Sequence, residues 1–193
     1  MDISQAKEIL GKQFSLICED ANTVIQHLNL SPHAKILDVG TGKGYFAIIL
    51  AINGYNVLTG EPESDNSIYA KQKWLSNAQQ VGVDSFIKFR AFDAQDMLFD
   101  DDMFDAIFFF GVLHHIDEHV RKKVLQESVR VSKPHAVICF FEPNQDGMKI
   151  VKELYFSHPE PADPREYTQG LNVSLQKKKG ILFDSFIFHK DHA

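Results

Sequence analysis

The sequence has only two cysteines among its 193 residues and no long apolar run. Cys18 and Cys139 lie far apart, and Cys139 falls in the apolar stretch AVICFF, where a packed thiol is the simplest expectation. These cysteines do not suffice for a disulfide framework or a zinc ribbon. No window reaches the roughly 18 apolar residues of a membrane span, and the N-terminus has no basic stretch before an apolar core. We therefore expect a soluble, cytoplasmic protein with no membrane partner.

An excess of positive charge is also missing. Lysine and arginine number 20 against 26 acidic residues, which leaves a formal charge of −6. This balance argues against a nucleic-acid partner, because such binding needs a basic surface. The hydrophobic content of 44% is typical of a globular protein. We expect a single domain over residues 1–193, with an N-terminal helical segment over residues 1–30 and a small lid or connection over residues 145–180.

Short β-type runs alternate with longer stretches of helical period along the chain. The run DAIFFFGV is apolar on both faces, which suits a parallel strand covered by helices on each side. The alternation predicts an α/β, Rossmann-like, doubly wound sheet. Strands are expected at residues 35–39, 56–60, 86–92, 104–110, 136–142 and 181–189, and helices at about residues 5–28, 45–52, 66–80, 118–131, 146–156 and 166–179.

The first predicted strand ends in the glycine-rich stretch DVGTGKG. In an open parallel sheet, ligands bind outside the carboxyl ends of the strands, and glycines there let a ligand approach the backbone. A nucleoside-triphosphate loop is excluded, because Lys43 is followed by Gly44 rather than by serine or threonine. The dinucleotide fingerprint is disfavoured, because Tyr45 stands where it requires its third glycine.

The charge beside this loop favours a cationic ligand. Asp38 would face a pyrophosphate unfavourably, whereas an ammonium group suits it better. S-adenosylmethionine carries an ammonium group and a sulfonium but no phosphate. Two further acids follow later strands: Glu61 can accept the hydroxyls of a ribose, and Asp93 can accept the amino group of an adenine.

These motifs, in this order and spacing over residues 30–145, resemble the class I S-adenosylmethionine-dependent methyltransferases, in particular the small-molecule branch similar to quinone-biosynthesis methyltransferases. The resemblance implies S-adenosylmethionine as cofactor, S-adenosylhomocysteine as product and a small organic methyl acceptor. A protein that binds these two molecules without catalysis, as a sensor or assembly partner, is the alternative. The implied cofactor-binding residues are Asp38, Gly40, Thr41, Gly42, Gly44, Glu61, Pro62, Asp93, Ala94, Phe110 and Gly111.

The stretch HHIDEH, residues 114–119, allows two further interpretations. A metal site would need His115 and His119 on one helix face at four-residue spacing. We expect the helix to begin near Asp117, which leaves His114 and His115 in the preceding loop, and so we predict no metal ion here. A histidine in this loop can instead take a proton from the acceptor. His114 and His115 are therefore candidate catalytic bases, with a purely structural pair as the alternative.

The resemblance also narrows the acceptor and raises a question about the C-terminus. The fourth strand lacks both the tetrapeptide of nucleic-acid amino methyltransferases and the magnesium-binding aspartate of catechol-type enzymes. Family members usually end in two antiparallel strands, but only one strand is apparent after Gly180. We therefore expect a short or incomplete antiparallel edge, completed in one version by a homo-oligomeric partner. We also expect residues 145–180 to cover the acceptor pocket poorly.

Overall fold

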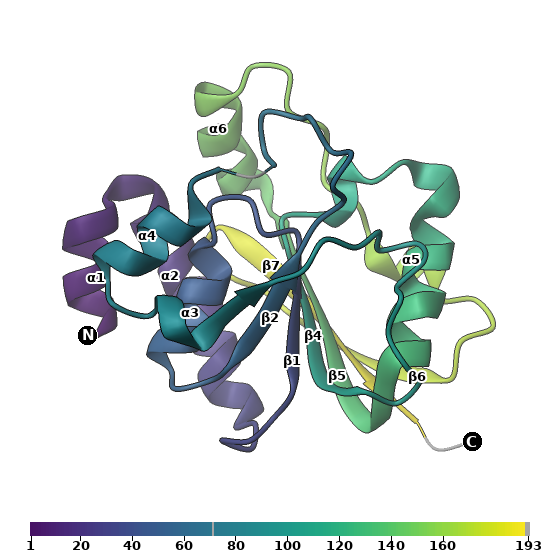
Figure 1. The fold of residues 1–193 in the computed structure, drawn as a ribbon. Coiled ribbons are helices and arrows are strands. Elements are labelled where there is room, and N and C mark those ends of the chain that lie inside the picture. The colour runs from purple at the N-terminus through teal and green to yellow at the C-terminus, as the bar shows by residue number, and fades with distance from the viewer. Residues whose placement is uncertain (71, 192–193) are drawn as a thin grey trace.

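The centre of the molecule, in a computed structural model that describes residues 1–70 and 72–191, is a seven-stranded sheet (Figure 1). The strand order is β3-β2-β1-β4-β5-β7-β6. The first five strands run parallel, and β7 lies antiparallel to both β5 and β6. The predicted Rossmann-like α/β sheet is thereby confirmed. The strands are β1 (Ile36–Val39), β2 (Val57–Gly60), β3 (Ile87–Phe89), β4 (Phe104–Phe110), β5 (Ser132–Pro143), β6 (Val173–Lys178) and β7 (Phe183–Lys190).

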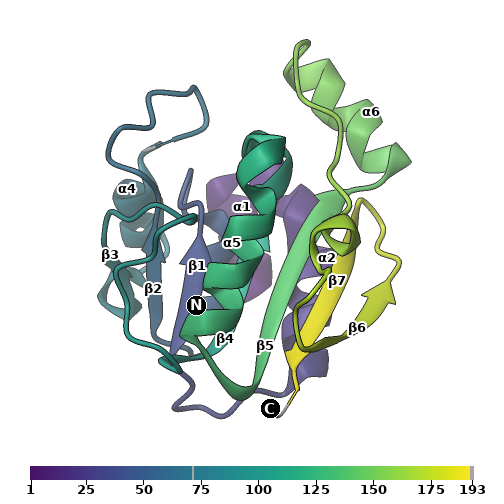
Figure 2. The same cartoon turned by 90° about the vertical axis from the view of Figure 1, so that its right-hand side faces the viewer.

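Helices cover both faces of the sheet. Four helices lie on one face and α5 lies on the other, while α6 stands beyond the carboxyl ends of the parallel strands, as Figure 2 shows from the side of α5. The sheet therefore has a core on each face, and its carboxyl edge carries a separate helical cover. The helices are α1 (Ile3–Leu10), α2 (Lys12–Leu28), α3 (Tyr45–Ile52), α4 (Trp74–Gln80), α5 (Glu118–Val131) and α6 (Gln145–Leu154).

Strand β4 is buried on both faces, as its sequence predicts. Phe108 packs in the core beneath α1 to α4, and its neighbour Phe109 packs in the core beneath α5. Both side chains are fully buried. Because burying a phenylalanine contributes roughly 1.5–3 kcal/mol, this strand anchors the centre of the sheet.

Two predicted helices are shorter or interrupted. The helix expected over residues 5–28 is two helices, because Gly11 has a φ of +79° and separates α1 from α2. Of the helix expected over residues 66–80 only α4 forms, and residue 71 lies outside the described residues. Just before α4, the N–H of Gln72 donates to a carbonyl of the loop after β1 rather than to a helical partner. This segment is therefore part of the ligand edge of the sheet.

The helix predicted over residues 166–179 is wrong. A 3-10 turn at Pro164–Tyr167 is followed by β6, an outer strand that pairs along its length with β7. Side chains in this strand are mostly exposed, and Lys177 reaches the Asp184 carboxylate at 2.9 Å. Pairing with β7 overrides the helix preference of the lysines. The chain thus supplies its own last edge strand of six residues, which agrees with the expected short antiparallel edge rather than with an incomplete one.

Membrane-spanning helices are absent from the described residues: within residues 1–70 and 72–191, no helix is both long and apolar enough to cross a bilayer.

Candidate active site

A cavity of about 720 Å³ opens at the carboxyl ends of β1, β2 and β4. The strand order reverses here, since β2 and β3 lie on one side of β1 and β4 lies on the other. Open α/β sheets bind their ligands at such a switch point, and the volume is that of a typical small-molecule site, about 300–1,000 Å³. The predicted site residues that line it are Gly40, Thr41, Gly42, Glu61, Pro62, Asp93, Ala94, Phe110, Gly111, His114 and His115.

Glu61 is a buried acidic residue in the lining of this cavity. It directly follows β2, is 5% exposed and accepts a hydrogen bond from the backbone N–H of Gly42 at 2.9 Å. Gly42 has a φ of +46°, a conformation that glycine adopts more easily than other residues. The loop and the carboxylate are therefore fixed relative to each other before any ligand arrives.

Asp38 lies behind the lining of the cavity rather than in it, and its contact with an amino group stays a prediction. Because side chains alternate along β1, Asp38 faces the helices α1 to α4, opposite Thr59 of β2. The Thr59 hydroxyl donates to Oδ2 at 2.7 Å and lies 2.9 Å from the hydroxyl of Thr41, whereas Oδ1 has no partner among the described residues. Burial raises the pKa of Asp38 to about 7. Asp38 thus supports the glycine loop from behind.

Gly44 is the second predicted residue that lies outside the cavity wall. It begins α3 with a φ of +72°, and a Cβ there would come within 2.8 Å of the Cβ of Trp74 in α4. The glycine is needed because α3 and α4 pack closely at this point. Its role is in packing rather than in lining the cavity.

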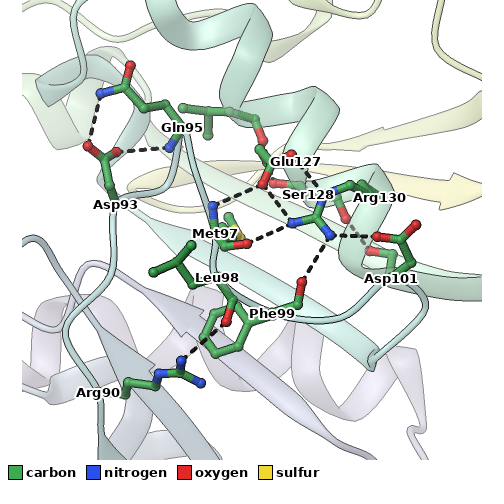
Figure 3. A network of polar contacts seen from close by, with 12 residues as sticks. Arg90, Asp93, Gln95, Met97, Leu98, Phe99, Asp101, Glu127, Ser128 and Arg130 are labelled. Atoms are coloured by element: carbon green, nitrogen blue, oxygen red, sulfur yellow. Dashed lines mark hydrogen bonds and ion pairs between the residues drawn. The ribbon is translucent and has the colours of Figure 1, made fainter.

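The segment that carries Asp93 and Ala94 is attached to α5 by hydrogen bonds. Arg130 of α5 donates to the carbonyl of Met97 at 2.7 Å and to that of Phe99 at 2.9 Å (Figure 3). In return, the N–H of Met97 donates to the carboxylate of Glu127 at 2.9 Å. This network holds the segment beside the cavity, although neither Arg130 nor Glu127 could be recognised as important from the sequence.

The same segment forms a tight turn at Asp93. The carboxylate accepts both the backbone N–H and the side-chain amide of Gln95, each at 2.9 Å (Figure 3). Asp93 is exposed at the rim, and Ala94 is buried beside it. The pair therefore presents a polar acceptor and a backbone edge next to each other.

His114 forms a buried pair with Glu142. Its Nδ1 lies 2.5 Å from the Glu142 carboxylate, and both side chains are almost fully buried. The other ring nitrogen, Nε2, has no hydrogen-bond partner among the described residues. Glu142 lies near the end of β5. It was not among the site residues predicted from the sequence.

Three histidines meet at one end of the cavity. The rings of His115 and His114 lie 4.2 Å apart, and His158 lies 4.8 Å from His114 and 4.9 Å from His115. Burial, followed by the neighbouring imidazoles, lowers the pKa of His115 to about 3. His119 does not join them, because it is exposed and pairs with Asp117 at 2.6 Å. His158 lies in the irregular loop after α6 and was not predicted.

The cover over the cavity comes from α6 and the residues after it. Ile150, Val151 and Leu154 of this helix line the cavity, together with Tyr155 and His158. The segment expected to cover the pocket poorly therefore contributes an apolar wall.

Comparison with known proteins identifies the family. A family described as methyltransferase domain matches residues 37–140. A demethylmenaquinone methyltransferase from Clavibacter sepedonicus is 33% identical over 121 residues, which are 63% of this chain and 46% of that protein. The O-methyltransferase resE from Aspergillus sclerotiorum is 28% identical over 135 residues, which are 66% of this chain and 49% of that protein. The chain thus spans about half the length of these relatives.

A solved structure shares the fold over nearly the whole chain. The S-adenosylmethionine-dependent methyltransferase from Aquifex aeolicus superposes with a TM-score of 0.67 at 20% identity, covering 98% of this chain and 99% of its own. The predicted resemblance is confirmed. The family match includes more than half of the residues of this chain. The chain therefore belongs to the methyltransferase domain family, within the class I S-adenosylmethionine-dependent methyltransferases.

Proposed function

We propose that the chain transfers a methyl group from S-adenosylmethionine to a small organic acceptor. The observation that carries this proposal is the buried Glu61 carboxylate, which is fixed by Gly42 at the switch point of the sheet. The relatives support it, because the proteins from Clavibacter and Aspergillus are described as methyltransferases and the solved Aquifex structure as an S-adenosylmethionine-dependent one.

The residues around the cavity fit this cofactor in kind and order. Glu61 would accept the ribose hydroxyls, with Pro62 packed on the adenine. Asp93 and Ala94 would meet the edge of the adenine, since both line the cavity and are held in place through α5. The methionine portion would lie along the open backbone of the glycine loop and the end of β4, at Gly40, Thr41, Gly42, Phe110 and Gly111.

The bound cofactor supplies an activated methyl group on its sulfonium. The chain has to align the acceptor with that methyl group and keep water away. The apolar side chains of α6 suit both tasks, because they line the cavity. An acceptor with an apolar body therefore fits better than a highly charged one.

A hydroxyl or acidic-carbon acceptor also needs to lose a proton. His114 is the better placed of the two predicted bases, because Glu142 holds its Nδ1 and leaves Nε2 for a proton. His115 is the weaker base, because its pKa is lowered to about 3. A thiol or an amine needs no such group.

Other parts of the proposal concern location and partners. A cytoplasmic site of action suits the two free, buried cysteines, which a reducing compartment keeps as thiols. A homo-oligomer is not required, because β6 pairs with the edge of β7 that a partner was expected to cover. The non-catalytic alternative was favoured by the expectation that residues 145–180 cover the pocket poorly. It loses this support because α6 lines the cavity.

The test is methyl transfer from methyl-labelled cofactor to panels of phenols, quinols, thiols and amines, with S-adenosylhomocysteine measured as product. We expect product with at least one acceptor class and none with Gly42→Val, which places a side chain where the backbone meets the cofactor. Tight binding of S-adenosylhomocysteine without turnover on any panel would favour the sensor alternative. Absence of both binding and turnover in a folded sample would refute the proposal.

A further inference from the structure

The three histidines at the end of the cavity bring ligand atoms together. His114 and His115 lie in the short turn after β4, and His158 comes from the loop after α6. One nitrogen from each ring lies within 4.8 Å of the others. Two segments that are distant in the sequence thus contribute imidazoles to one cluster, in which Tyr69 also packs against His115 and His158.

The second observation concerns which nitrogens are left over. The Nδ1 of His114 is engaged by the Glu142 carboxylate at 2.5 Å, and the Nδ1 of His158 lies 2.9 Å from the carbonyl oxygen of Pro159. Histidines that bind metals commonly donate one ring N–H to a carboxylate or a backbone carbonyl, which directs the other nitrogen to the ion. In both residues Nε2 is the nitrogen that remains.

The Nε2 of His114 is buried and has no hydrogen-bond partner among the described residues. Leaving such an atom without a partner is costly, typically about 1–3 kcal/mol. The tilted contacts between the imidazole rings leave this nitrogen without a partner. A ligand that accepts the lone pair of the nitrogen would remove the cost.

We propose that His114, His115 and His158 bind a divalent transition-metal ion of the zinc type. Three imidazoles and one open position form the pattern of a catalytic zinc site. The present spread of up to 4.8 Å has to contract to roughly 3.3 Å, as tetrahedral bonds of about 2.0–2.1 Å require. Glu142 orients His114 from behind without touching the ion.

The open position faces the cavity, because all three histidines line it. It would bind an oxygen or a sulfur of the acceptor, and the ion would make a bound hydroxyl more acidic. This part rests on the proposed methyl transfer, whereas metal binding does not. An ion on the Nε2 of His114 would take the place of that nitrogen as a base, so the two roles exclude each other.

The experiment uses the full chain without a polyhistidine tag, stripped by a chelator that is then removed, and titrated calorimetrically with Zn²⁺. We expect one equivalent to bind, and at least tenfold weaker binding in His158→Ala. The matched control is His119→Ala, which removes an exposed histidine outside the cluster and should bind as the wild type does. Glu142→Gln should weaken binding by about 10–100-fold, the usual effect of losing an orienting partner.

Co²⁺ provides an independent readout, because a tetrahedral site gives intense visible absorption that His158→Ala should lose. Absence of stoichiometric Zn²⁺ binding, or equal affinity in wild type and His158→Ala, would overturn the proposal. S-adenosylhomocysteine binding is measured on the same samples with and without metal. Failure of that binding would count against the proposed function, and failure of Zn²⁺ binding alone would count only against the metal site.

Discussion

At the scale of single residues, Glu61 is the side chain on which the proposed cofactor site depends most. Replacing it in Glu61→Gln keeps the shape and removes the charge. Hydrogen bonds to charged groups contribute about 1.5–3 kcal/mol, so the affinity for S-adenosylmethionine should fall by roughly 10–100-fold. Titration calorimetry measures this directly, together with a circular-dichroism spectrum to verify folding.

The matched control for that variant is Glu63→Gln, two residues further along. Glu63 is exposed and does not line the cavity, so its neutral variant should bind the cofactor like the wild type. Equal loss in both variants would indicate a general charge effect. An unchanged affinity in Glu61→Gln would remove Glu61 from the binding site.

Asp38 should make stability depend on pH in an unusual direction. Its pKa is about 7 in the folded chain, against a reference value of 3.8. Between these values the folded state keeps a proton that the unfolded state has lost, so the free energy of unfolding falls as the pH rises through this window. In Asp38→Asn this contribution is missing. The variant should therefore gain stability relative to the wild type from pH 4 to pH 7, on the order of 1 kcal/mol per pH unit.

Urea unfolding of both proteins at several pH values in this window tests the prediction. The quantity to compare is the slope, against pH, of the difference in free energy of unfolding between Asp38→Asn and the wild type. The asparagine also changes the hydrogen bond from Thr59, but this shifts the difference by a constant amount. Asp100→Asn, at an exposed position, serves as the control and should show a flat difference. A flat difference for Asp38→Asn would mean that its carboxyl titrates alike in both states.

At the scale of elements, hydrogen bonds from α5 hold the segment that follows β3. Because this segment lines the cavity, losing them should weaken both stability and ligand binding. Arg130→Met removes the hydrogen bonds to the carbonyls of Met97 and Phe99. We expect a loss of about 1–3 kcal/mol in the free energy of unfolding and faster amide exchange over residues 91–103. S-adenosylhomocysteine should also bind more weakly, although Arg130 does not line the cavity.

The comparison for Arg130→Met is Lys122→Met, an exposed position on the same helix. It should leave both amide exchange and affinity unchanged. If Arg130→Met lost stability without any change in exchange or affinity, the network would be structural only.

The elements also show where sequence patterns predict structure and where they do not. The strand over residues 104–110 and the helix over residues 118–131 form as predicted. The strand is an almost continuous apolar run, and the helix buries one face. The strand β6 was mistaken for a helix, because its side chains are mostly exposed and its pattern contains lysines that favour helices. Such a strand depends on pairing with β7, which has no local signal in the sequence.

At the scale of the whole molecule, most of the site is assembled from five segments, one after each of the five parallel strands. Four of them run directly along the cavity edge, and the fifth forms a helical cover. The four could be predicted, because parallel strands bring their carboxyl ends to one edge. The fifth, α6 with His158, follows β5 and folds over that edge, and no rule of sheet topology places it. The place of Asp38 behind the cavity lining could not be predicted either, because its charge suits the ligand whereas the alternation along β1 directs its side chain towards the helices.

The central claim is that this cavity binds S-adenosylmethionine, and thermal unfolding with added ligands tests it most directly. The account predicts that S-adenosylmethionine and S-adenosylhomocysteine, each at about 100 times its dissociation constant, add about 2.7 kcal/mol and raise the melting temperature by roughly 5–10 °C. NAD should have no effect, because the loop lacks the dinucleotide fingerprint. A folded sample whose melting temperature does not change with either adenosyl compound, or rises only with NAD, would contradict the account.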